Sequence, residues 1–136
     1  MGRIEGWEGR LNGVMEAARH EPYALGSHDC FRLACRVVEA LTGIDRWPEF
    51  MGYRTKREAV EAIAVHGSNF EAAGDWFFEV ENVKPAYARR GDIVALQTDD
   101  GEKHLGVCLG IQAAYLAPDG LTFIPTITAL CAWRIG

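Results

Sequence analysis

The chain has 136 residues, of which 49% are hydrophobic and 24% are charged, a balance typical of one globular domain with a buried core. Its 14 basic and 19 acidic residues give a formal net charge of -5 without any run of like charges, which argues against nucleic acid as a partner. No apolar stretch is long enough to span a membrane, and the amino terminus MGRIEGWEGRL lacks the pattern of a secretory signal. We therefore expect a single domain over residues 1–136 that is made in the cytoplasm and has no membrane partner.

The first half of the chain has the apolar spacing of amphipathic helices. A first helix is marked by Trp7, Leu11, Val14, Met15 and Ala18. A second helix is predicted from Cys30 to Leu41, with Ser27 as its N-cap, Asp29 close behind and Gly43 at its end.

Two capping boxes predict two further helices. The first, TKRE at Thr55–Glu58, opens a helix that stops at Gly67. The second, SNFE at Ser68–Glu71, opens a short helix that ends by Gly74. After this point the apolar period changes from that of a helix to that of a strand.

Alternating patterns in the second half predict strands separated by turn residues. The strands are expected at Trp76–Val80, Asp92–Gln97, His104–Leu109, Ala113–Ala117, Leu121–Ile124 and Ala129–Arg134. Asp92 is interpreted as a turn or capping residue, and PDG at Pro118–Gly120 as a hairpin turn. Helices followed by strands indicate an α+β domain in which N-terminal helices pack on a mostly antiparallel C-terminal sheet.

The four cysteines have no paired C-x-x-C spacing, so we expect no metal site, no disulfide framework and no cofactor. Cys35, Cys108 and Cys131 are interpreted as packing residues. Cys30 differs because it lies in the first turn of a predicted helix, where free amide hydrogens can lower the pKa of a thiol. Taken alone, Cys30 is either a reactive nucleophile or a small buried hydrophobe.

A second informative stretch is KHLGVCLG, residues 103–110. In a strand, Leu105 and Val107 share the more apolar face, while His104 and Gly106 share the other. His104 therefore stands at the start of a strand and points away from the most apolar side, where its imidazole could meet a helix terminus.

Together these segments resemble the NlpC-type branch of the papain-like cysteine peptidases. The matching blocks, in the family's order, are Asp29 and Cys30 at a helix start, Gly91–Val94 opening a strand, and His104–Val107. The compact HDC helix, the YRT before a helix and the closing AWRI are similar to small NlpC-type proteins encoded among the tail genes of phages, prophages and gene-transfer particles. The resemblance implies a papain-like fold.

The resemblance also implies a mechanism for cleaving peptidoglycan stem peptides. Cys30 would attack an amide carbonyl, and His104 would accept its proton. The family places a third polar residue where this chain has Leu116, which cannot orient an imidazole. Gln112, Tyr115 or Asp119 could take that role.

Several alternatives remain open at this point. His28 could tune the thiol, contact the substrate or be a solvated loop residue. Asp29 is interpreted as a helix-start carboxylate rather than a catalytic acid, and it could also tune the thiol or contact the substrate. The protein could be a cysteine amidase or endopeptidase, or a catalytically degenerate adaptor bound to a tail hub or baseplate protein. Either form would be made in the host cytoplasm and then enter the tail tip or baseplate of the virion.

Overall fold

The computed structural model describes residues 2–47 and 53–136, in which four α-helices precede a five-stranded antiparallel sheet. This order confirms the predicted α+β class. The helices are α1 (Trp7–His20), α2 (Cys30–Thr42), α3 (Lys56–Ala64) and α4 (Phe70–Phe78). The strands are β1 (Ile93–Gln97), β2 (Lys103–Cys108), β3 (Gln112–Ala117), β4 (Gly120–Pro125) and β5 (Cys131–Trp133). Two short 3-10 helices, η2 (Pro85–Tyr87) and η3 (Thr126–Thr128), lie between them.

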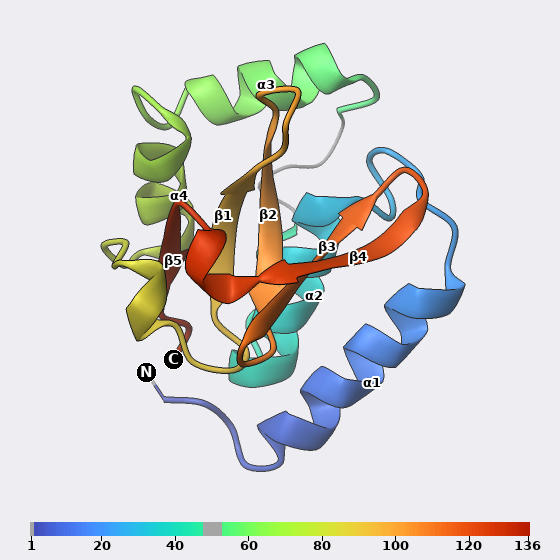
Figure 1. Ribbon diagram of the computed structural model, residues 1–136, viewed down its shortest axis with the longest axis vertical. Helices are drawn as coiled ribbons and strands as arrows, with labels where there is room; N and C mark the ends of the chain where they lie inside the picture. Colours follow the sequence, from blue (N-terminus) through green and yellow to red (C-terminus); the bar gives the residue numbers. More distant parts are fainter. Residues whose placement is uncertain (1, 48–52) are drawn as a thin grey trace.

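The sheet has the strand order β4-β3-β2-β1-β5, and every pair of neighbouring strands is antiparallel. Helix α2 lies against the sheet, α1 packs along α2, and α3 crosses above the tip of the β1–β2 hairpin (Figure 1). The main core lies between helices and sheet and includes Leu33, Val37, Leu105 and Val107. A smaller apolar cluster covers the other face of the sheet, which matches the predicted alternation along β2.

The five strands predicted from Asp92 onward agree with the observed strands to within one or two residues at each end. The predicted hairpin turn is also present, because Ala117 pairs with Gly120 across it. The interpretation of three cysteines as packing residues is confirmed by the burial of Cys35, Cys108 and Cys131.

Helix α2 is capped by Asp29, so the predicted N-cap at Ser27 is wrong by two positions. Asp29 has an extended backbone, and its side chain accepts a hydrogen bond from the Arg32 amide at 2.9 Å. Ser27 instead lies in a tight turn, where its amide donates to the Ala24 carbonyl. The chain therefore completes a turn before the helix begins. The predicted end at Gly43 is confirmed by its left-handed backbone, with φ at 80°.

Helix α4 continues past Gly74 to Phe78, so the predicted strand at Trp76–Val80 is wrong. Its N-cap is Asn69, one residue after the predicted Ser68. Gly74 lies inside the helix, and the Trp133 ring packs directly against it. A larger residue would not fit there, because an added Cβ would lie 2.1 Å from Trp133 Cζ2. Here glycine makes room for a ring and does not end the helix.

Asp92 connects both ends of the chain to the sheet. Its carboxylate is fully buried, accepts a hydrogen bond from the Arg89 amide at 2.7 Å and pairs with Arg3 Nη2 at 2.8 Å. It also accepts a hydrogen bond from the Ile135 amide at 3.0 Å. The turn interpretation of Asp92 is confirmed, but sequence patterns missed its buried ion pair, which places the two termini at one corner (Figure 1).

Replacing Gly74 with alanine is expected to destabilise the protein by about 1–3 kcal/mol, since overpacking against Trp133 outweighs the better helix propensity of alanine. Gly13→Ala is the matched control, because Gly13 lies inside α1 with nothing within 4 Å of an added Cβ. That control is expected to gain roughly 0.5–1 kcal/mol. Urea unfolding followed by circular dichroism measures both changes, and equal stabilities for Gly74→Ala and wild type would contradict this packing.

Candidate active site

Cys30 is the first residue of α2 and lines a cavity of about 400 Å³. Apolar side chains from α2, α3 and α4, among them Phe31, Ile63 and Phe70, form much of its wall. His104 of β2 lines the same cavity. The two residues that the sequence singled out as nucleophile and base therefore contribute to one concave site.

The position of Cys30 is set by the carboxylate of Asp29, which is 2% exposed. Asp29 accepts hydrogen bonds from the Gly26 amide at 2.8 Å, the Arg32 amide at 2.9 Å and the Tyr53 hydroxyl at 2.5 Å. The interpretation of Asp29 as a helix-start carboxylate is confirmed. Because its oxygens are occupied by these donors, Asp29 acts on the site mainly by holding Cys30 in place.

Burial raises the pKa of the Cys30 thiol to about 12. The backbone amides of Leu105, Phe31 and Cys30 lower this pKa, and the charge of Asp29 raises it further. The helix-start effect expected from the sequence is thus present but is outweighed by the loss of solvent. The thiol is protonated at neutral pH, and its sulfur lies against the amide of Leu105, the residue that follows His104.

The imidazole of His104 faces the turn that joins β1 to β2. Its Nε2 lies 3.4 Å from Thr98 Oγ1 and 3.8 Å from Glu102 Oε2. Burial lowers the pKa of His104, while the charges of Glu102 and Asp100 raise it and that of Lys56 lowers it. Since the net direction is downward, His104 is mostly neutral at neutral pH and can accept a proton.

Of the three residues expected to orient His104, the structure brings Tyr115 to it, with ring centroids 5.5 Å apart. Gln112 begins β3 at the end of the strand away from His104, and Asp119 lies in the turn between β3 and β4. Leu116 is 1% exposed and packs in the core beneath the helices. This leucine therefore has a packing role.

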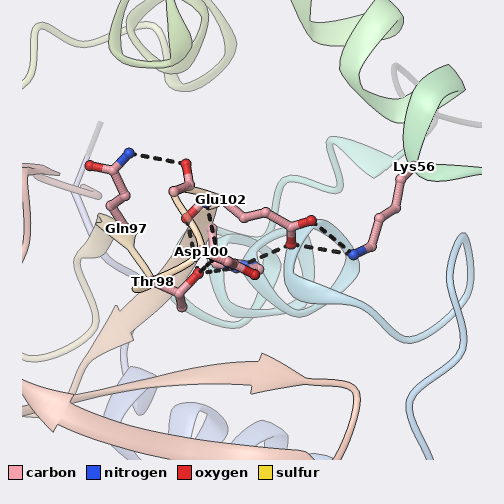
Figure 2. A network of polar contacts seen from close by, with 7 residues as sticks. Lys56, Gln97, Thr98, Asp100 and Glu102 are labelled. Atoms are coloured by element: carbon pink, nitrogen blue, oxygen red, sulfur yellow. Dashed lines mark hydrogen bonds and ion pairs between the residues drawn. The ribbon is translucent and has the colours of Figure 1, made fainter.

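Sequence reasoning missed the contribution of Thr98, Glu102 and Lys56 to this site. Figure 2 shows Lys56 reaching from α3 to the carboxylate of Glu102, with Thr98 and Asp100 in the same network. One signal was available, because Glu102 precedes His104 by two residues and such residues lie on one side of an extended chain. The reach of Lys56 from α3 had no such signal.

His28 is buried, with 1% of its surface exposed, so its interpretation as a solvated loop residue is wrong. Its Nδ1 lies 2.9 Å from Glu21 Oε2 and 3.1 Å from Arg36 Nη1. These partners belong to the end of the α1 region and to α2. The cavity wall is built from other residues.

Within residues 2–47 and 53–136, no three His, Cys, Asp or Glu side chains form a group that could hold a metal ion. Over the same residues, no helix combines the length and the apolar character needed to cross a membrane.

Alkylation of Cys30 by iodoacetamide is expected to be slow near neutral pH and to rise on the order of tenfold per pH unit between pH 8 and 10, because the thiolate is the reacting form. Peptide mapping by mass spectrometry measures the rate at Cys30, with Cys30→Ser showing the background from the three buried cysteines. A rate that reaches its plateau below pH 8 would contradict the raised thiol pKa.

No curated protein matches the chain. A family model described as "Domain of unknown function (DUF6950)" matches residues 2–135, nearly the whole length of the chain. The chain therefore belongs to the DUF6950 family.

Proposed function

We propose that the chain is a phage tail-associated member of the NlpC-type papain-like cysteine peptidases that cleaves an amide bond in peptidoglycan stem peptides. The observation that carries this proposal is the meeting of Cys30 and His104 in one cavity, with the Cys30 sulfur at the amide next to His104. A helix that begins with cysteine and packs against an antiparallel sheet supports the papain-like assignment.

With both residues neutral at rest, cleavage would proceed by general-base catalysis. His104 takes the thiol proton as the Cys30 sulfur bonds to the carbonyl carbon, and the Cys30 backbone amide stabilises the oxyanion. The imidazolium then returns this proton to the leaving amine as the carbon–nitrogen bond breaks. Water, deprotonated by His104, next attacks the thioester, which releases the carboxylic acid and restores the thiol.

The cavity suits a short peptide. A volume of about 400 Å³ lies within the range of small-molecule sites, and its wall is mostly apolar. Lys56 and Lys103 also line it, paired with Glu102 and Glu71, so its rim carries polar groups that a peptide could meet.

A second candidate function is that of a catalytically degenerate adaptor bound to a tail hub or baseplate protein. The burial of Leu116 in the core and the raised pKa of Cys30 favour this alternative. In both cases the protein is made in the host cytoplasm and is then incorporated into the tail tip or baseplate of the virion.

Incubation of the purified protein with peptidoglycan sacculi separates the two functions. Wild type is expected to release stem-peptide fragments with new amino termini, detected by mass spectrometry, while Cys30→Ala and His104→Ala release on the order of 100-fold less or none. Cys35→Ala is the matched control on the same helix, because Cys35 is buried in the core away from the cavity.

Circular dichroism confirms that each variant is folded before its activity is compared. Release of fragments by folded Cys30→Ala would contradict the assigned nucleophile. Absence of release by folded wild type, together with its retention on isolated tail particles, would favour the adaptor.

A further inference from the structure

The turn between β1 and β2 presents several acceptor oxygens to one nitrogen of His104. Thr98 Oγ1 lies 3.4 Å from Nε2, and Glu102 Oε2 lies 3.8 Å from the same atom. Among the described residues, the hydrogen bonds of the His104 ring involve Nε2 and not Nδ1. The turn therefore places acceptor oxygens beside Nε2 and not beside Nδ1.

The partners of Thr98 determine which nitrogen of His104 carries hydrogen. The Thr98 hydroxyl has a single hydrogen, and its other partners are the Asp100 carboxylate and the Glu102 carbonyl, which can only accept. In the contact with His104, the Thr98 hydroxyl oxygen therefore accepts the hydrogen bond and Nε2 donates it. The Glu102 carboxylate, 3.8 Å from Nε2, adds negative charge on the same side, so Nε2 carries the hydrogen and Nδ1 keeps the lone pair that a base needs.

The backbone of Glu102 is held within the turn, and its carboxylate is held from α3. Within the turn, the Glu102 amide donates to Asp100 Oδ1 at 2.9 Å, and the Thr98 amide donates to the Glu102 carbonyl at 2.9 Å. From α3, Lys56 Nζ donates to Glu102 Oε1 at 3.0 Å and to Oε2 at 3.3 Å (Figure 2). Because both side chains are partly exposed, this pair adds little stability, but it limits where the carboxylate can lie.

We propose that Glu102, supported by Thr98 and Lys56, is the positioning residue of His104 and supplies the orienting acceptor that Leu116 cannot provide. This inference rests on the proposed function. It places the orienting group before the histidine in the chain, in the turn that enters β2. With hydrogen on Nε2, Nδ1 is the ring nitrogen of His104 that can accept a proton.

Imidazole ¹⁵N NMR of the full chain tests the proposal without turnover, since it reports both the tautomer and the pKa of His104. The charged and titratable groups facing His104 are Glu102, Asp100, Lys56 and Tyr115. Wild type is expected to show mainly the Nε2-protonated tautomer. Glu102→Gln is expected to lower the pKa of His104 and to mix the tautomers, whereas Lys56→Met is expected to raise that pKa because it removes a nearby positive charge.

Glu61→Gln is the matched control, because Glu61 is an exposed glutamate of α3 that pairs with Arg57. It is expected to leave the tautomer, the pKa and the turnover unchanged. In peptidoglycan cleavage, Glu102→Gln is expected to lower kcat on the order of tenfold or more with KM nearly unchanged, since the base is misplaced while the binding wall is intact.

An unchanged tautomer and pKa in Glu102→Gln would overturn the inference, even if wild type proves to be an active enzyme. The inference would also fail if Tyr115→Phe lost kcat while Glu102→Gln kept it, because the orienting group would then be the Tyr115 hydroxyl. The expected NMR changes in a wild type that cleaves no peptidoglycan would contradict the proposed function while supporting the placement of hydrogen on Nε2.

Discussion

The buried carboxylate of Asp29 joins the segments on which the candidate site depends. It accepts hydrogen bonds from the loop at Gly26, from the first turn of α2 at Arg32 and from Tyr53. A buried carboxylate is costly unless such donors surround it, so these segments stabilise one arrangement together. Cys30 follows Asp29 directly, and its place at the cavity is a consequence of that arrangement.

The same burial that fixes Cys30 also determines how the site can react. Loss of solvent raises the pKa of the thiol and lowers that of His104, so both groups are neutral at rest. A neutral pair reacts only if the imidazole presents an unprotonated nitrogen as the sulfur attacks. The tautomer of His104 therefore matters as much as its distance from Cys30, and the turn containing Glu102 provides a means of selecting it.

A feature of the fold or of the candidate site could be predicted from the sequence where the residues that cause it are neighbours in the chain. Helix spacing, strand alternation and the order of Cys30 and His104 are local signals, and they predicted the α+β class and two residues of the cavity. The end of α4 was missed because the ring that packs on Gly74 belongs to Trp133, far along the chain. The sign of the thiol pKa and the support of Glu102 by α3 were missed for the same reason, since burial and cross-element ion pairs arise from tertiary packing.

The most direct test of a cysteine peptidase mechanism is to trap its covalent intermediate. Wild-type protein is mixed with soluble stem-peptide fragments, quenched in acid and examined by intact-mass and peptide-mapping mass spectrometry. The proposed mechanism predicts an acyl group on Cys30 that is absent from His104→Ala treated in the same way. Fragment cleavage with Cys30 left unmodified at every quench time, or an acyl group on another cysteine, would contradict it.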